Sequence, residues 1–293
     1  MQEKKRPTIL VTGANGQLAS ELKMLTGDHP SYLFLFTTKD ELPIENSQAL
    51  QLFFNKNQID YCINCAAYTA VDKAESDEEK AFLINAEAVG VLAGICKSNE
   101  IKFIHVSTDY VYDGSKEMPL NEGDAVGPVN VYGASKLKGE QLAIENNPAS
   151  LIVRTSWVYS SFGNNFVKTM LRLFKEKEEI NVIADQHGSP TYAADLAATI
   201  LLFIRHMESG QTFSGIVNYC NSGVTTWYEF AEAIKQATGS NCKINPIPTS
   251  AYKTAAKRPL YSVLDTSKIK ALLHSEIPGW NDALQRCLHL LEK

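Results

Sequence analysis

A strand–turn–helix pattern with two glycines, close to the N-terminus, most constrains what this chain can fold into. The apolar run Ile9-Leu10-Val11 is typical of a buried strand, and helical periodicity begins at Leu18. Gly13 and Gly16 stand at the turn between them, where glycine lets the backbone approach a pyrophosphate and the helix N-terminus faces its charge. The third small position is Ala19, which still permits close helix–strand packing. The pattern predicts a dinucleotide-binding unit, and an ordinary tight βα turn is the alternative.

Strand and helix signals continue to alternate through the first half of the chain. Strands are expected near residues 8–12, 32–37, 60–65, 102–107 and 151–155, and helices near 17–26, 47–56, 77–98 and 132–146. Short connections between alternating elements predict an α/β fold with a doubly wound parallel Rossmann sheet, whose ligands lie at the carboxyl ends of the strands.

The pattern changes beyond residue 155. Helices are expected near 164–177, 193–207 and 226–238, between short strand candidates that prolines interrupt. We expect a dinucleotide-binding domain over residues 1–155, with return segments from about 180–220. Residues 156–293 then form mainly a smaller, interleaved substrate-binding lobe.

Composition narrows the classes of partner. The chain has 293 residues, 44% of them hydrophobic, and a formal net charge of −5, so it offers no broad basic surface for nucleic acid or an anionic membrane. We find no run near the roughly 20 apolar residues that cross a bilayer. No signal-peptide pattern precedes the first expected strand, so we expect a cytoplasmic protein.

The cysteines and histidines do not suggest a metal or redox centre. Cys62 and Cys65 form a C-x-x-C, but they fall within an apolar strand rather than at the start of a helix. The six cysteines fit reduced, buried thiols, and the six scattered histidines lack zinc-ligand spacing.

A candidate catalytic group lies between residues 107 and 136. Tyr132 and Lys136 are four residues apart at the start of an expected helix, so both project from one face. A lysine beside a tyrosine favours the phenolate and lowers a pKa that is normally about 10. Thr108, upstream, has a hydroxyl that could hydrogen-bond a carbonyl that the tyrosine protonates. The spacing Y-x-x-x-K alone is common on surface helices. The glycine turn supports a catalytic role for this pair, because it predicts a bound cofactor.

Taken together, the motifs resemble those of the extended short-chain dehydrogenase/reductases, and more narrowly the dTDP-4-dehydrorhamnose reductase family. The resemblance covers nearly the whole chain and rests on the order of its blocks. These read TGANGQL, NCAAYTAVDKAE, STDYVYDG, NVYGASKLKGE, RTSWVY, GNNFVKTML, DQHGSPT, PTSAY and KRPLYSVLD.

The resemblance implies roles for individual residues. It makes Thr108, Tyr132 and Lys136 the catalytic triad, with Tyr132 and Lys136 also contacting the cofactor. The other cofactor-binding residues that it implies are Gly13, Gly16, Gln17, Leu18, Pro43, Ile44, Ala67, Tyr68, Thr69 and Val106. The substrate-binding residues are Val71, Thr108, Asp109, Trp157 and Arg258. A core position for Trp157, a loop cap for Asp109 and a surface ion pair for Arg258 are the structural alternatives.

The implied reaction is NAD(P)H-dependent reduction of the C4 keto group of dTDP-4-dehydro-L-rhamnose to dTDP-L-rhamnose. An acidic residue at the end of strand two would bind the ribose hydroxyls of NADH. That strand instead ends at Thr37-Thr38-Lys39, and the next residues are Glu41-Leu42-Pro43-Ile44 where relatives often have E-L-D-I. The absence of an acidic residue at the end of this strand favours NADPH. Asp40 could still reach the ribose, so NADH remains an alternative cofactor.

Three further points stay open. Some relatives dimerise through Mg²⁺ held by carboxylates, and Glu21 and Asp195 occupy matching positions, although both also fit ordinary helix residues. A homodimer is therefore an open expectation.

Another sugar-nucleotide epimerase, dehydratase or reductase is one alternative function. The second is a non-catalytic NADP-binding regulatory subunit, resembling the β subunit of methionine adenosyltransferase.

Overall fold

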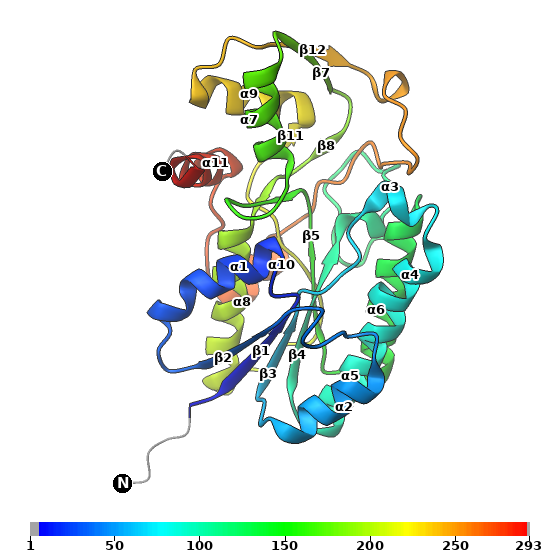
Figure 1. The fold of residues 1–293 in the computed structure, drawn as a ribbon, viewed down its shortest axis with the longest axis vertical. Helices are drawn as coiled ribbons and strands as arrows, with labels where there is room; N and C mark the ends of the chain where they lie inside the picture. The colour runs from blue at the N-terminus through cyan, green and yellow to red at the C-terminus, as the bar shows by residue number, and fades with distance from the viewer. Residues whose placement is uncertain (1–5, 292–293) are drawn as a thin grey trace.

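The computed structural model describes residues 6–291 (Figure 1). Residues 1–5 lie outside the described part; they begin the expected first domain and are part of the stretch in which we expected no signal peptide. Residues 292–293 also lie outside it.

A six-stranded parallel sheet forms the centre of the larger part of the molecule. Its strand order is β10-β5-β4-β3-β1-β2, and every pairing within it is parallel. The strands are β1 (Thr8–Thr12), β2 (Leu33–Thr37), β3 (Tyr61–Asn64), β4 (Lys102–Thr108), β5 (Leu151–Thr155) and β10 (Gly215–Asn218). The order reverses between β1 and β3, and ligands of doubly wound sheets bind at such a switch point. The predicted fold class is confirmed.

Helices cover both faces of this sheet, because alternate strand residues supply two separate cores. On one face Ile9 and Val11 pack with side chains of α1 (Gln17–Met24), α8 (Ala193–Glu208) and α10 (Ser267–Leu273). On the other face Leu10 packs with side chains of α2 (Ser47–Lys56), α5 (Ala88–Ser98) and α6 (Val131–Asn146). Short helical turns complete this part, namely η1 (Leu25–Asp28), α3 (Val71–Ala74), α4 (Glu78–Phe82), η2 (Leu83–Glu87) and η3 (Asp109–Val111).

The remaining elements form a smaller lobe with its own core, at the upper end of the view in Figure 1. Its helices are α7 (Phe166–Glu176), α9 (Trp227–Thr238) and α11 (Trp280–Leu291), with the short turn η4 (Thr249–Ala251). Its strands pair two by two: β6 (Val158–Tyr159) with β9 (Thr191–Tyr192), β7 (Glu179–Ile183) with β12 (Lys243–Ile247), and β8 (His187–Gly188) with β11 (Thr225–Thr226). Between the lobe segments the chain returns to the large sheet through α8 and β10.

One stretch corrects the expectation that no segment is apolar enough to cross a membrane. Residues 78–98, which run through α4, η2 and α5, pass that test by length and composition. In the structure 56% of the apolar window is buried, and Val89 and Leu92 belong to the core beneath the sheet. Such burial is typical of a core helix.

Candidate active site

A cavity of about 510 Å³ lies where the carboxyl ends of the sheet strands meet the lobe. This volume falls in the range of small-molecule sites. The sheet, α1 and α6 provide one side, and the β5–β6 segment, the β6–α7 segment and the start of α9 provide the other. Of the residues that the resemblance implied, the following line it: Gly16, Gln17, Leu18, Ala67, Thr69, Val71, Val106, Thr108, Asp109, Tyr132, Lys136 and Trp157.

The glycine turn brings the N-terminus of α1 to this cavity. Gly16 is the N-cap residue and offers no side-chain cap, and the first turn of α1 contains no acidic residue. The first-turn N–H groups of a helix have no partner within the helix, so an uncapped end suits an anion. Gly13 lies beneath the turn with φ of +70°, and a Cβ there would be 2.8 Å from Ala66 Cα. Only glycine fits that position.

The segment after β3 supplies backbone and small side chains to the cavity wall. Ala67, Thr69 and Val71 line it, whereas Tyr68 is not among the lining residues. The N–H of Tyr68 donates to Asn85 Oδ1 at 2.8 Å, and its hydroxyl donates to Asp77 Oδ2 at 3.1 Å. Tyr68 therefore fixes the segment to the helices behind it.

Two elements bring the proposed triad together. Thr108 is the last residue of β4, and Tyr132 and Lys136 are on the first turns of α6. The helix starts there because the side chain of Asn130 accepts a hydrogen bond from Gly133 N at 2.7 Å. Thr108, Tyr132 and Lys136 all line the cavity.

The environment of Tyr132 corrects the expectation that Lys136 lowers its pKa. Burial raises the pKa of Tyr132 to about 12; a hydrogen bond with the Thr108 side chain lowers it, and the charge of Asp109 raises it. The Lys136 amine has other partners: its Nζ donates to Val106 O at 2.7 Å and lies 3.2 Å from His105 Nε2. Burial in turn lowers the pKa of Lys136 to about 8. Tyr132 is therefore a protonated phenol at neutral pH.

Asp109 presents a buried carboxyl to the cavity. Its side chain is 2% exposed, and Oδ1 accepts a hydrogen bond from Thr108 Oγ1 at 3.0 Å. Oδ2 is buried and has no hydrogen-bond partner in the described structure. Burial raises the pKa of Asp109 to about 6, against the opposing influence of the nearby Ser262 and Thr108 side chains. Asp109 is therefore a cavity-lining residue whose carboxyl is buried, with one oxygen that lacks a hydrogen-bond partner.

Trp157 lies against a second tryptophan that the sequence analysis missed. The rings of Trp157 and Trp227 stack with centroids 3.6 Å apart, and both line the cavity. Trp227 is the first residue of α9, which a capping box between Thr226 and Glu229 begins. The T-x-x-E pattern before an apolar run was the available signal for this helix start, although not for its place in the site.

Asn164 and Asn165 are adjacent in the chain but have different roles. Asn164 lines the cavity. Asn165 caps α7 by accepting from Lys168 N at 3.0 Å, and its amide donates to Gln17 Oε1 at 2.9 Å. Other lining residues outside the predicted set are Asn15, Cys65, Ser107, Tyr110, Thr155, Val158, Gly163 and Leu196. Burial raises the pKa of the Cys65 thiol to about 12, so it is no thiolate nucleophile.

Besides Gly13 and Tyr68, three predicted residues lie outside the cavity lining: Pro43, Ile44 and Arg258. Ile44 is 3% exposed in the core beside α2, next to Pro43. Arg258 forms a bidentate ion pair with Asp72: Nη2 donates to Oδ2 at 2.7 Å and Nη1 to Oδ1 at 3.1 Å. Asp72 neighbours Val71, so this ion pair lies next to a residue that lines the cavity.

Glu21 and Asp195, the residues that match the Mg²⁺-binding positions of some relatives, each have polar side-chain partners within this chain. Both oxygens of Asp195 accept hydrogen bonds from Arg286, each at 2.7 Å, and Asn221 Nδ2 donates to Oδ2. Glu21 is 4% exposed, and Ser160 Oγ donates to its Oε1. Among residues 6–291, no group of three His, Cys, Asp or Glu side chains is placed to hold a metal ion. Within this chain the Arg286 guanidinium is the positively charged partner of Asp195.

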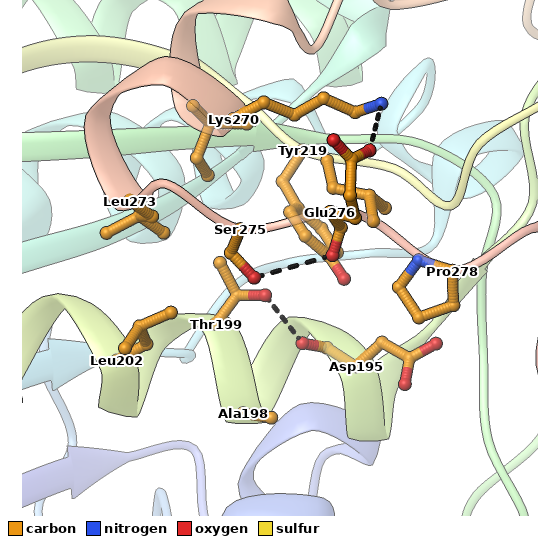
Figure 2. A pocket seen from close by; sticks show the side chains of 12 residues that line it. Asp195, Ala198, Thr199, Leu202, Tyr219, Lys270, Leu273, Ser275, Glu276 and Pro278 are labelled. Atoms are coloured by element: carbon orange, nitrogen blue, oxygen red, sulfur yellow. Dashed lines mark hydrogen bonds and ion pairs between the residues drawn. The ribbon is translucent and has the colours of Figure 1, made fainter.

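Asp195 also borders a smaller hollow, of about 190 Å³, between α8 and the segment that follows α10 (Figure 2). Its polar groups bond to one another: Thr199 Oγ1 donates to Asp195 O at 2.8 Å, and Lys270 pairs with Glu276 at 3.2 Å. The hollow shares no lining residue with the larger cavity. It is a minor feature beside the cavity that contains the triad.

Comparisons with known proteins agree with this arrangement. Residues 7–293 match the family model described as the RmlD substrate binding domain. The dTDP-4-dehydrorhamnose reductase of Burkholderia thailandensis is 41% identical over 292 residues, covering 96% of this chain and 97% of that protein. A crystal structure of a dTDP-4-dehydrorhamnose reductase from Clostridium acetobutylicum has a TM-score of 0.92 and 39% identity, covering 98% of this chain and 100% of that chain. One from Bacillus anthracis, in complex with NADP, has a TM-score of 0.93 and 36% identity over the same shares. The chain belongs to the dTDP-4-dehydrorhamnose reductase family.

Proposed function

We propose that the chain reduces the C4 keto group of dTDP-4-dehydro-L-rhamnose to dTDP-L-rhamnose, with NADPH as the reductant. The observation that carries this proposal is the single cavity that Thr108, Tyr132, Lys136 and the uncapped N-terminus of α1 share. Relatives named for this activity match nearly the full length of the chain.

The residues around the glycine turn fit a dinucleotide. Gly16, Gln17 and Leu18 would hold the diphosphate at the N-terminus of α1, where N–H groups and the helix dipole favour negative charge. Gly13, at a position where only glycine fits, supports that turn from below. When bound, the reduced nicotinamide supplies the hydride that adds to the carbonyl carbon.

The β3 and β4 segments would flank the rest of the cofactor. Ala67, Thr69 and Val106 line the cavity, and Lys136 would hydrogen-bond the ribose hydroxyls next to the nicotinamide. Tyr68 would act by fixing the β3 segment through Asn85 and Asp77.

Tyr132 and Thr108 would handle the oxygen of the substrate carbonyl. A phenol with its pKa raised to about 12 carries its proton at neutral pH, which is the form that a general acid needs. As negative charge develops on the C4 oxygen, Tyr132 donates this proton and Thr108 donates a hydrogen bond. Tyr132 already lines the cavity, whereas the Thr108 hydroxyl, which donates to Asp109 Oδ1 in this structure, would turn from that carboxylate to the substrate oxygen.

The sugar would lie between Asp109 and the tryptophan stack. Asp109 would accept a hydrogen bond from a sugar hydroxyl, and the two tryptophans would border the apolar side of the sugar ring. Val71 would border the sugar on the side of the β3 segment. Arg258 would exchange Asp72 for the substrate diphosphate, since a guanidinium binds either group in the same bidentate manner.

The end of β2 supports the choice of NADPH over NADH. Lys39 is exposed there, next to exposed Asp40. The carboxylate of Glu41 accepts hydrogen bonds from the N–H and the hydroxyl of Thr38, both at 2.9 Å, which turns it back onto the backbone. Lys39 would then pair with the 2′-phosphate. Saturation kinetics with the two reduced cofactors test this, and a strong preference for NADH would contradict it.

The two parts of the chain would bind different ligands. Residues 1–155, with the returning α8 and β10, would bind the dinucleotide, and the lobe within residues 156–293 would close over the sugar nucleotide. Because both ligands are nucleotides of biosynthetic metabolism, a cytoplasmic location belongs to this proposal.

Incubation with dTDP-4-dehydro-L-rhamnose and NADPH tests the proposed function. Loss of NADPH absorbance together with formation of dTDP-L-rhamnose supports it. Tight binding of NADPH without any absorbance loss would instead favour a regulatory subunit that binds the cofactor and another protein.

A further inference from the structure

Four buried polar side chains form a row across the end of the sheet, below the cavity. Thr12, Asn64 and His105 are 0%, 1% and 0% exposed, and Lys136 is 2% exposed. Thr12 pairs in register with Asn64 across β1 and β3, and Asn64 pairs with His105 across β3 and β4. Register partners on adjacent strands place their side chains about 5 Å apart on one face. Lys136 reaches the end of this row from α6.

The row is hydrogen-bonded throughout. Thr12 Oγ1 lies 2.6 Å from Asn64 Oδ1, and Asn64 Nδ2 lies 3.0 Å from His105 Nδ1. His105 Nε2 lies 3.2 Å from Lys136 Nζ, which also donates to Val106 O at 2.7 Å. Thr12 Oγ1 further accepts from Ala66 N at 3.3 Å. The Lys136 amine is thereby tied to the ends of β1 and β3, from which the glycine turn and the cavity-lining β3 segment emerge.

Burying such a row costs free energy, because its polar groups give up their hydrogen bonds to water. Its presence where apolar side chains could pack therefore indicates a function. The neighbouring positions two residues earlier on the same strands are apolar core, namely Leu10, Cys62 and Phe103. Neither Asn64 nor His105 lines the cavity. The direct side-chain contact from this row to a cavity-lining residue is the one between His105 and Lys136.

We infer that His105, held in turn by Asn64 and Thr12, is a positioning residue that fixes where the Lys136 amine sits in the cavity. This rests on the proposed function, in which Lys136 binds the cofactor ribose. The imidazole is suited to the task because burial, and then the charge of Lys136, hold the pKa of His105 well below its usual range. With its proton on Nδ1, a neutral ring accepts a hydrogen bond from Lys136 at Nε2 and adds no second buried positive charge. The Asn64 amide then presents its oxygen to Nδ1 and its nitrogen to Thr12 Oγ1, within the same short contacts. The other titratable groups that act on Lys136 are Glu140, one turn further along α6, and Cys65.

Two polar substitutions at residue 105 separate positioning from packing. In His105→Gln the amide reaches the place of Nε2 and can still contact Lys136. In His105→Asn the amide reaches only the place of Nδ1, so it keeps a partner for Asn64 and loses Lys136. Phe103→Leu, two residues earlier on β4 and stacked against His105, is the control for a core defect alone.

We expect His105→Asn to lower kcat/KM for NADPH by about tenfold to a hundredfold, as a displaced catalytic group predicts. Most of the loss should be a higher KM for NADPH, with an altered alkaline limb in the pH profile of kcat/KM. His105→Gln should stay within about threefold of the wild type, since it keeps the contact. Phe103→Leu should lower the melting temperature while its kinetics and pH profile stay those of the wild type.

Equal kinetic losses in the Gln and Asn variants, or wild-type kinetics and pH profile in both, would overturn the positioning role. Activity of the wild type is measured first and tests the proposed function separately. If the wild type does not turn over, NADPH affinity by fluorescence titration gives the same comparison: the role predicts weaker binding by the Asn variant alone, and equal affinities overturn it.

Discussion

The indole rings of Trp157 and Trp227 stack in parallel, with centroids 3.6 Å and planes 9° apart. Trp157 follows β5 of the large sheet, and Trp227 begins α9 of the lobe. The stack therefore joins the two parts of the molecule at the cavity that both residues line. Trp157 has φ of +47°, a conformation that bulky residues rarely adopt, so tertiary contacts hold it there.

Gly188 on β8 is one of these contacts, which gives a first prediction. A Cβ at residue 188 would lie 2.5 Å from Trp157 Cε2, so Gly188→Ala must displace the indole. We expect the KM for the sugar nucleotide to rise about tenfold, the equivalent of about 1.4 kcal/mol of lost aromatic contact, with NADPH affinity unchanged. Steady-state kinetics measure this. Gly27→Ala, which meets no atom within 4 Å, is the control, and an unaltered KM in Gly188→Ala would count against the stack as a sugar site.

Asp109 makes stability depend on pH. Burial raises its pKa from 3.8 to about 6, so between these values the folded protein binds more protons than the unfolded chain. The contribution of this group to stability therefore falls as pH rises through that window. We expect Asp109→Asn to stabilise the protein by up to about 3 kcal/mol at pH 7.5, with the gain gone below about pH 4.

Urea unfolding at pH 7.5 and pH 4 measures this difference. Asp113→Asn is the control, because hydrogen bonds from Ser115 lower the pKa of that exposed carboxylate and its removal should bring no gain. A stability gain for Asp109→Asn that does not change with pH would show that titration of Asp109 is not its source.

The Arg258–Asp72 ion pair allows a matched test of the diphosphate contact. Either Arg258→Ala or Asp72→Ala removes the pair, but only the first removes the guanidinium. Loss of a charge-assisted contact predicts that Arg258→Ala raises the KM for the sugar nucleotide about tenfold. Asp72→Ala should leave that KM unchanged or lower it, because it frees Arg258. Equal KM increases in the two variants would indicate that the ion pair has only a structural role and that Arg258 does not contact the diphosphate.

The sequence predicted the sheet well because its strands and helices carry strong local signals. The apolar run before Gly13 became β1, and the Asn130 cap began α6 within one residue of the predicted start. Local periodicity and capping do not depend on distant partners, so they can be read along the chain. The four lobe strands of only two residues each, β6, β8, β9 and β11, carry no such signal.

The interior of the site was harder to predict because its contacts join distant residues. Spacing placed Tyr132 and Lys136 on one helix face, but it could not show that the Lys136 amine contacts His105. That contact depends on the register of β3 and β4 and on how α6 packs over them. Trp227 was missed for the same reason, since only the lobe fold brings it to Trp157.

The most direct test of the whole account compares the wild type with Tyr132→Phe in one assay. Both are given dTDP-4-dehydro-L-rhamnose and NADPH, and NADPH oxidation, dTDP-L-rhamnose formation and NADPH affinity are measured. The account predicts turnover by the wild type and a loss of about 10²–10⁴-fold in Tyr132→Phe, with NADPH still bound. A wild type that binds NADPH without oxidising it, or a Tyr132→Phe variant with near-normal turnover, would contradict it.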